Sequence, residues 1–570
     1  MTNGFYSIIS FFFFIFLLRN ILFWVSLWQI KEYRSDRLRA HLLSTRQGRS
    51  LIFGFENIIK ITVLLLFFLI IFVDKLTFYY SIIVSVIYLI SFIKVIYELT
   101  NKKFKLPKIT IKSILIFFLT FLIGLLLYLL PLLDKFFWLV FVDKILTFII
   151  AFEIALFSIP SDFYKDLIIY RAVKKRNLYK KLLVIGVTGS YGKGSTKEYL
   201  ATILSGKFNI LKTPSNNNTS IGVAKTILSS LNERKQIFVV EMGAYKIGEI
   251  KEICSIAKPR VGILTAVNDQ HIALFGNLNN TMKAKYELIE SLPNNGFSMF
   301  NAGNPNSLNL ACKTKRKKII YFADYNDKTA QILKEAPSLS QETESLHMLP
   351  YEACENKNLE YDIVATNIKI DKFQISFNVE LKNKNKKISS LKVRLLGGYN
   401  VENLLPGIYL ADYLGMTKSE IRESLKKILP IKKTMEPFIT QKKTVFIDDT
   451  YNSGFASVDS AVEYMKLYKG KKALVLSPLI ELGKNASFDH YSLALKIGGI
   501  CDYLILTNND FIEEIKKGID KSQGECVIMV DSPKNIASFI SVTFAKNDVV
   551  VFEGREAGLP LKFLEYEKVN

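Results

Sequence analysis

The chain has few of the residues from which disulfide frameworks and zinc sites are built. Its 570 residues include only five cysteines and four histidines, and no two cysteines form a C-x-x-C pair. We therefore expect neither a disulfide framework nor a zinc site. Scattered cysteines of this kind are typical of reduced thiols in a cytosol. A cleavable signal peptide is also not predicted, because the N-terminus lacks a basic stretch and a cleavage site of small residues.

Acidic residues are in the minority. The chain has 52 Asp and Glu residues and 75 Lys and Arg residues, which gives a formal net charge of +23. Basic loops beside membrane segments explain part of this excess. Basic and aromatic residues do not interleave as they do in nucleic-acid-binding segments, so we expect no nucleic acid among the partners.

Long apolar runs dominate the first 160 residues. A membrane-spanning helix needs about 20 apolar residues, and the stretches that qualify are 5–30, 58–73, 76–97, 111–133 and 136–159. The fifth stretch is less regular, since it contains Asp143, Lys144 and Glu153. Asp143 and Lys144 either pair with each other, line a polar pocket, or lie near a membrane interface on a shorter or tilted helix. We favour the last interpretation.

Loop charges predict the orientation of this membrane domain. The first loop, the third loop and the segment after the fifth stretch are rich in Lys and Arg, whereas the second and fourth loops hold little charge. Basic loops remain inside, so the N-terminus is expected outside and the rest of the chain in the cytoplasm, where ATP is available. We predict a multi-pass protein of the cell membrane, with a membrane domain of about five helices at 1–160 and a basic juxtamembrane linker at 161–181.

The remainder of the chain indicates α/β structure. Short β-branched apolar runs alternate with helical stretches, which is typical of parallel strands covered on both faces. The interval 360–396 alternates polar and apolar residues around a turn and predicts an inserted antiparallel hairpin. A boundary near 432–437 divides a central domain at 182–434 from a C-terminal domain at 435–570.

The most specific motif is Gly186-Val-Thr-Gly-Ser-Tyr-Gly-Lys-Gly-Ser-Thr-Lys-Glu198, which lies between an apolar run and a helical stretch. The N–H groups of such a turn, and the N-terminus of the helix after it, bind phosphate. Lys193 can reach the β- and γ-phosphates, and a hydroxyl that follows it can hold Mg²⁺. The residues expected to bind the nucleotide here are Gly189, Ser190, Gly192, Lys193, Gly194, Ser195 and Thr196.

Further polar residues follow other predicted strands. They include Glu241, His271, Asp449 and Arg555, and ligand sites of open α/β sheets gather at the carboxyl ends of strands. Glu241 is the best supported as a Mg²⁺ ligand, because a carboxylate that ends an apolar strand needs a partner. The remaining histidines lack such a context, and we assign no chemistry to His41, His347 or His490.

Taken in order, these motifs resemble the Mur ligases of peptidoglycan synthesis, and within that family most closely the branch that adds D-alanyl-D-alanine. The resemblance covers about residues 182–570. It rests on Thr188-Gly-Ser-Tyr-Gly-Lys-Gly-Ser-Thr-Lys-Glu198, Asn217-Asn-Thr-Ser-Ile-Gly222, Glu241-Met-Gly-Ala-Tyr-Lys-Ile-Gly-Glu249, His271-Ile-Ala-Leu-Phe-Gly276, Ala284-Lys-Tyr-Glu-Leu-Ile-Glu290, Asn400-Val-Glu-Asn403, Asp448-Asp-Thr-Tyr-Asn452 and Glu481-Leu-Gly-Lys484. It implies a P-loop Mur-ligase central domain and a Rossmann-like C-terminal domain behind an α-helical membrane domain.

The resemblance also implies roles for single residues. Catalysis would rest on Lys193, Glu241, His271 and Lys285, and the Mg²⁺ ligands would be Ser195, Glu241, His271 and Lys285. Lys285 matches a family lysine that CO₂ carbamylates, which turns a cation into an anionic metal ligand. The nucleotide would also contact Asn403, Asp449, Tyr451 and Asn452, and the substrates would contact Asn217, Asn218, Thr219 and Arg555.

The implied activity is ATP-dependent amide-bond formation through an acyl phosphate. The acceptor would be a muramyl peptide and the donor an amino acid or a dipeptide such as D-Ala-D-Ala. Membrane segments stand where the family has a domain that binds the uridine nucleotide of the substrate. A lipid-linked acceptor, or another envelope polymer such as poly-γ-glutamate, therefore stays open. Tyr399 replaces a usual histidine and Thr434 stands where arginine is common, which leaves a non-catalytic ATP-binding membrane scaffold as a further alternative.

Overall fold

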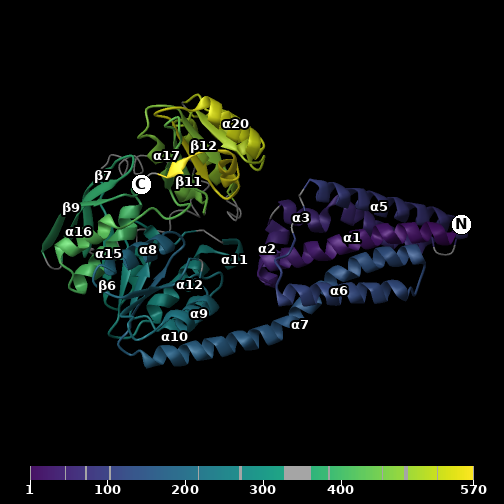
Figure 1. Cartoon of the computed structure of the whole chain (residues 1–570), viewed down its shortest axis with the longest axis horizontal. Helices are drawn as coiled ribbons and strands as arrows, with labels where there is room; N and C mark the ends of the chain where they lie inside the picture. Colours follow the sequence, from purple (N-terminus) through teal and green to yellow (C-terminus); the bar gives the residue numbers. More distant parts are fainter. Residues whose placement is uncertain are drawn as a thin grey trace. The chain divides into compact units, whose positions relative to one another are not determined.

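The computed structural model describes residues 2–44, 46–70, 73–101, 104, 106–215, 217–268, 272–325, 361–382, 385–451, 453–479, 486–522 and 524–568. The chain forms two compact units, Met1–Leu167 and Ile168–Asn570. Figure 1 shows an all-helical first unit and a second unit of helices and sheets.

The first unit contains α1 (Thr2–Ile30), α2 (Ser35–Ser44), α3 (Arg46–Phe53), α4 (Phe55–Ile70), α5 (Asp74–Thr100), α6 (Ile111–Leu129) and most of α7 (Lys135–Leu178). Among the described residues, four segments are long and apolar enough to cross a membrane: Tyr6–Ile30, Gly48–Ile70, Leu76–Thr100 and Ile111–Leu129. They correspond to the first four predicted stretches. The fifth, 136–159, lies within α7 and is not among these segments, so it stays a prediction.

Helix α7 is longer than the sequence indicated. It runs for 44 residues and includes Pro160, although proline in a helix interior removes one backbone hydrogen bond. The predicted linker at 161–181 is therefore mostly helix.

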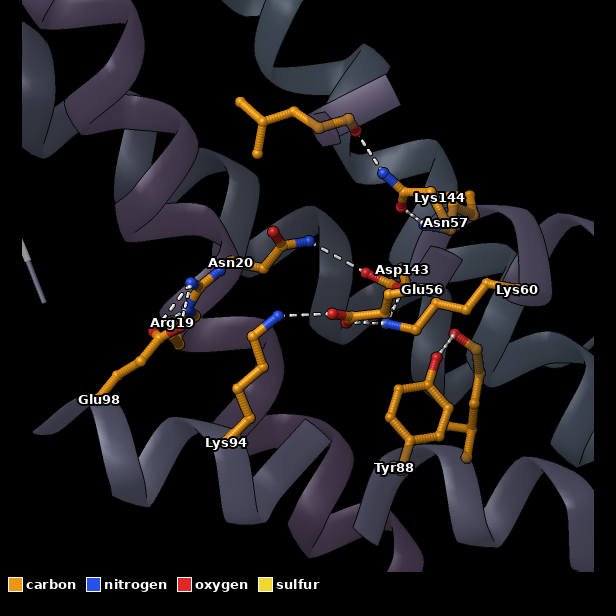
Figure 2. A network of polar contacts seen from close by, with 12 residues as sticks. Arg19, Asn20, Glu56, Asn57, Lys60, Tyr88, Lys94, Glu98, Asp143 and Lys144 are labelled. Atoms are coloured by element: carbon orange, nitrogen blue, oxygen red, sulfur yellow. Dashed lines mark hydrogen bonds and ion pairs between the residues drawn. The ribbon is translucent and has the colours of Figure 1, made fainter. Parts of the chain in front are cut away.

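A network of charged side chains crosses the interior of the helical unit (Figure 2). Lys60 of α4 and Asp143 of α7 lie 3.0 Å apart, and each side chain is only 1% exposed. The second oxygen of Asp143 accepts a hydrogen bond from Asn20 of α1 at 3.0 Å. Lys144 donates instead to Asn57 at 2.5 Å. The interpretation in which Asp143 pairs with Lys144 is therefore wrong, because helix packing gives each residue its own partner.

The network continues toward α5. Glu56 lies 3.4 Å from Lys60 and 2.7 Å from Lys94. Arg19 donates to both carboxylate oxygens of Glu98, each at 2.9 Å. Ionic contacts thus tie α1, α4, α5 and α7 together.

The central domain is built on a nine-stranded sheet of order β2-β3-β1-β4-β5-β6-β7-β8-β9. Its strands are β1 (Leu183–Thr188), β2 (Ile210–Lys212), β3 (Ile237–Glu241), β4 (Val261–Leu264), β5 (Phe297–Asn301), β6 (Lys318–Ala323), β7 (Ile363–Ile370), β8 (Ile375–Leu381) and β9 (Lys386–Val393). Strands β1 to β7 pair in parallel, whereas β7, β8 and β9 pair antiparallel. The parallel sheet and the predicted hairpin in 360–396 are both confirmed.

Helices cover both faces of this sheet. They are α8 (Lys193–Leu204), α9 (Ser220–Ser230), α10 (Glu249–Ala257), α11 (Ile272–Phe275), α12 (Leu278–Glu290), α13 (Pro305–Lys313), α15 (Asn400–Tyr413) and α16 (Lys418–Lys426). Successive residues of β1 point to opposite faces, so Ile185 joins one apolar cluster and Val184 the other. This two-sided burial explains why the strands are continuously apolar.

The C-terminal domain has a seven-stranded sheet of order β14-β13-β12-β15-β11-β10-β16. The strands are β10 (Glu436–Ile439), β11 (Val445–Asp449), β12 (Lys472–Leu476), β13 (Tyr503–Leu506), β14 (Val527–Val530), β15 (Val549–Glu553) and β16 (Glu567–Lys568). The helices are α17 (Phe455–Met465), α18 (Ala486–Gly498), α19 (Ile512–Asp520) and α20 (Pro533–Thr543). Five neighbouring strands are parallel, which confirms the predicted α/β fold.

The cysteines behave as expected at three positions. Cys254, Cys501 and Cys526 are free thiols. Cys354 lies outside the described residues, so the expectation of reduced thiols throughout the chain stays a prediction.

Candidate active site

The phosphate-binding loop joins the end of β1 to the start of α8. Two of its glycines adopt positive φ angles, 155° at Gly189 and 76° at Gly192. A Cβ at Gly189 would overlap Thr265 Oγ1, and one at Gly192 would lie 2.5 Å from Asn403 Oδ1. Both positions therefore require glycine, and the chain turns tightly enough to present its N–H groups at the helix N-terminus.

Residues after β4 hold this loop in place. The Ser190 N–H donates to Ala266 O at 2.6 Å, and Ser190 Oγ accepts from the Asn268 N–H at 3.0 Å. Thr265 Oγ1 donates to Tyr191 O at 2.5 Å. The hydroxyl of Ser190, predicted to bind nucleotide, is thus engaged by the protein. Thr265 and Asn268 were not predicted as supports of the loop, because neither belongs to the phosphate-binding motif.

Lys193 is the first residue of α8 and folds back over the loop. Its ammonium donates to Ser190 O at 3.1 Å. Burial lowers the pKa of Lys193, and the nearby Glu241 carboxylate opposes that shift. The ammonium group therefore lies against the phosphate loop, and its contact with the β- and γ-phosphates stays a prediction.

Glu241 ends β3 beside the first turn of α8. A Cβ at Gly194 would lie 3.6 Å from Glu241 Oε2, which places the carboxylate beside the first turn of α8, the turn that also carries the predicted Mg²⁺ ligand Ser195. Glu241 Oε2 accepts from Lys197 Nζ at 3.0 Å, and Oε1 accepts from Asn218 Nδ2 at 3.2 Å. Lys197 was not predicted. Its position four residues after Lys193, on a helix face that is otherwise buried, is the signal that could have revealed it.

The donor set fits Mg²⁺. A serine hydroxyl and a carboxylate are hard oxygen ligands of the kind this ion prefers, and both stand at the helix N-terminus that would receive the phosphates. Within the described ranges, no three His, Cys, Asp or Glu side chains gather as a metal cluster. His271, the predicted ligand of a second Mg²⁺, lies outside the described residues.

Lys285 is buried on α12, with 4% of its surface exposed. Burial, with the repulsion of Lys193 as the next cause, lowers its pKa to about 7. Its ammonium lies 5.8 Å from the centre of the Phe275 ring, and the carboxylates of Glu249 and Glu287 oppose the lowering of its pKa. An amine in this setting is largely unprotonated above neutral pH.

Other predicted residues serve the local structure. Thr196 donates to Asn403 Oδ1 at 3.3 Å, and both are buried, so α15 is fastened to α8 beside the loop. Thr219 accepts from the Gly222 N–H at 3.3 Å and caps α9. The Asn217 N–H donates to Pro214 O at 3.1 Å, which shapes the turn that presents Asn218 to Glu241.

In the C-terminal domain, Asp449 ends β11 and pairs in register with Glu553 at the end of β15. Burial raises the pKa of Asp449 to about 7, and burial followed by the Asp449 charge raises the pKa of Glu553. Tyr451 is 44% exposed. Its pKa is raised by burial and then by Glu241, while the positive charge of Arg555 lowers it. Asn452 lies outside the described residues.

Comparison with known proteins gives this site its family context. Residues 187–411 match the Mur ligase middle domain. This segment contains the phosphate loop, Glu241, Lys285 and Asn403. The predicted resemblance to the Mur ligases is therefore confirmed over the middle domain.

The curated relatives agree with this match. A UDP-N-acetylmuramoyl-tripeptide--D-alanyl-D-alanine ligase of Escherichia coli (strain K12) is 28% identical over 319 residues, which cover 56% of this chain and 63% of the relative. The corresponding ligase of Bacillus subtilis (strain 168) is 26% identical and covers 53% of this chain and 59% of the relative. The chain thus spans less than two thirds of the length of these relatives.

Solved structures support the fold. The structure of MurF from Acinetobacter baumannii has a TM-score of 0.57 at 21% identity. The match covers 70% of this chain and 79% of the MurF chain. The structure of MurF ligase from Thermotoga maritima in complex with ADP has a TM-score of 0.56 at 23% identity, with coverages of 70% and 82%. The predicted fold class is therefore confirmed for the α/β part of the chain.

Proposed function

We propose that this chain, which carries a Mur ligase middle domain and a MurF-like fold, is an ATP-dependent ligase that forms an amide bond in peptidoglycan precursor synthesis. The observation that carries the proposal is the grouping of Lys193, Ser195 and Glu241 around one helix N-terminus. The phosphate loop, a cation for the phosphates and two hard oxygen ligands meet at that point.

The reaction joins a carboxylate to an amine in two displacements. An oxygen of the acceptor carboxylate attacks the γ-phosphorus of ATP, and ADP leaves. The amine then attacks the carbonyl carbon of the acyl phosphate, loses a proton, and phosphate leaves. Lys193 and the loop N–H groups would bind the transferring phosphate and stabilise the charge that it develops.

The metal would be held by Ser195 and Glu241. When bound, Mg²⁺ neutralises part of the charge by which a carboxylate and a phosphate repel each other. Asn218 and Lys197 hold the carboxylate of Glu241 on its other sides, which fixes the direction in which its remaining lone pairs point.

We extend the proposal to carbamylation of Lys285. Only an unprotonated amine reacts with CO₂, and the pKa of about 7 supplies that form near neutral pH. The product is an anion close to Lys193. It would form an attractive pair with the Lys193 ammonium and would supply a further oxygen ligand for Mg²⁺.

The substrates follow from the relatives' names and from the first unit. The named relatives ligate D-alanyl-D-alanine to a UDP-linked muramyl tripeptide, and we propose the same donor, with Arg555 as a contact for its carboxylate. Four segments able to cross a membrane favour an acceptor that is itself lipid-linked. The catalytic unit would then lie on the cytoplasmic side of the cell membrane, with the N-terminus outside.

The test is phosphate release by the purified full chain in detergent. Release from ATP and Mg²⁺ should require D-Ala-D-Ala and a muramyl tripeptide, and Lys193→Ala should lower it by at least about a hundredfold. Lys386→Met is a matched control, since this lysine also pairs with a buried carboxylate, Asp412, but on the edge strand β9. Equal release by wild type and Lys193→Ala would contradict the proposal. Parallel assays with UDP-linked and lipid-linked acceptors distinguish the two acceptor classes.

A further inference from the structure

Lys197 is buried beside the proposed metal site, and the phosphate-binding motif gives it no role. Its side chain is 2% exposed, and its ammonium lies 3.0 Å from Glu241 Oε2 and 3.2 Å from Glu198 Oε1. Lys193 and Lys197 are four residues apart on α8 and therefore lie on one face of the helix. Yet Lys193 turns to the loop carbonyl of Ser190, while Lys197 turns to the carboxylate of Glu241.

We propose that Lys197 is a positioning residue that holds Glu241 ready for Mg²⁺ and keeps this carboxylate away from Lys193. This inference rests on the proposed function and names a residue through which the proposed metal ligand acts. Lys197 does not touch the substrates; it acts on the reaction through Glu241.

The first argument is the arrangement of the carboxylate. A carboxylate offers about four lone-pair positions, and the structure uses one on each oxygen, for Lys197 and for Asn218. The remaining positions lie next to the first turn of α8, since a Cβ at Gly194 would be 3.6 Å from Oε2. Two fixed donors thus orient Glu241 and still leave oxygen lone pairs for a metal ion.

The second argument concerns the competing ion pair. Lys193 is four residues from Lys197 on the same face of α8, so it is the next cation available to the Glu241 carboxylate. Without Lys197, the carboxylate of Glu241 would take Lys193 as its cation. In that pair, Lys193 would no longer be available to bind phosphate, and Glu241 would no longer be available to bind Mg²⁺.

A purely structural role makes a different prediction. If Lys197 only neutralised a buried charge, Lys197→Met would lower stability and leave the Mg²⁺ requirement of the folded protein unchanged. A positioning role instead changes how much Mg²⁺ the site needs. Partners that orient a metal ligand typically change metal affinity by about 10- to 100-fold when removed.

The experiment measures ADP binding to the full chain in detergent by calorimetry, over a series of Mg²⁺ concentrations. Lys197→Met should raise the Mg²⁺ concentration for half-maximal enhancement of ADP binding by at least about tenfold. Asn218→Leu should shift it in the same direction by a smaller factor, because it removes an uncharged donor. Lys197→Arg retains the cation and should return the titration toward that of wild type, and Lys386→Met should leave the titration unchanged.

The outcomes separate this inference from the proposed function. Titrations of Lys197→Met and Asn218→Leu that coincide with wild type would overturn the positioning role. If Lys197→Met does not fold, Lys197→Gln replaces it, because glutamine keeps a donor beside Glu241 without the charge. A Mg²⁺ titration of Lys197→Gln that coincides with that of wild type would overturn the inference. Wild-type protein whose ADP binding ignores Mg²⁺ would refute the proposed function itself.

Discussion

Two buried lysine–carboxylate pairs, one in each unit, share a geometry and differ in their surroundings. Lys60 and Asp143 lie 3.0 Å apart, as do Lys197 and Glu241. The pair in the helical unit is covered by an aromatic side chain, since the centre of the Phe16 ring lies 3.9 Å from the Lys60 ammonium. Each carboxylate accepts one hydrogen bond on each oxygen, but Glu241 lies beside the first turn of α8, which follows the phosphate loop. The same interaction therefore serves helix assembly in one unit and a candidate site in the other.

The surroundings of each pair also determine how much stability is lost when one partner is removed. Charges removed from water are expensive, and loss of one partner leaves the other unpaired. Lys60 retains only Glu56 at 3.4 Å, whose side chain is 40% exposed. Lys197 retains Glu198 at 3.2 Å, and Glu241 retains Asn218. We therefore expect the first unit to depend more on its pair for stability and the second to depend on its pair for metal binding.

Asp143→Leu should have the largest effect on stability. It leaves Lys60 buried without its main partner, and breaking such a pair costs about 3–5 kcal/mol. Thermal unfolding of the detergent-solubilised chain, followed by circular dichroism at the helical band, should register a lower midpoint for the first unit.

The control for this change is Lys60→Met/Asp143→Leu, which removes both charges. Apolar replacement of a whole buried pair is often neutral or stabilising, so the double variant should recover most of the lost stability. A double variant as unstable as Asp143→Leu would mean that the side chains are needed for their shape rather than their charge, and the comparison of the two pairs would fail.

Lys285 extends the comparison to a third buried lysine. Its folded-state pKa of about 7 lies below the ordinary lysine value of 10.5. Between these pH values the unfolded chain binds a proton at Lys285 that the folded chain lacks. The free energy of unfolding should therefore rise with pH in this window, by up to about 1.4 kcal/mol per pH unit.

Lys285→Met removes this titration. Denaturant unfolding of wild type and variant in CO₂-free buffers from pH 7 to 10 should give a difference in stability that changes with pH. As the pH rises, the free energy of unfolding of wild type should increase relative to that of Lys285→Met. Parallel curves would show that Lys285 is protonated in the folded chain, and the support for its carbamylation would be lost.

The sequence predicted those parts of the site that rest on short local motifs. The phosphate loop, Lys193 and the strand-ending Glu241 were identified because a strand, a glycine-rich turn and a helix start follow one another within a few residues. The antiparallel hairpin of β8 and β9 was predicted from similarly local signals, namely alternation and turn residues.

The ion pairs could not be predicted because they depend on tertiary packing. Lys60 and Asp143 are 83 residues apart, and Lys197 and Glu241 are 44 apart. Adjacency in sequence offered Asp143 with Lys144 as one alternative, yet neighbours on a helix point in different directions. Only the docking of α4 on α7, and of α8 on β3, decides which lysine meets which carboxylate.

The smallest effect should come from the exposed end of the same network. Lys94 and Glu56 lie 2.7 Å apart, but their side chains are 52% and 40% exposed. Neither side chain is enclosed by the helices and both are long and lose rotamer entropy when paired, so we expect a contribution of about 0–1 kcal/mol. In Lys94→Gln, Glu56 also keeps Lys60, so the unfolding midpoint in detergent should stay close to that of wild type. A loss of stability as large as that of Asp143→Leu would mean that the network depends on Lys94 as much as on its buried charges. The exposure of a side chain would then not indicate how much its ion pair stabilises the helical unit. Near-wild-type stability, together with a large effect of Asp143→Leu, would locate the stabilising contribution in the buried Lys60–Asp143 contact alone.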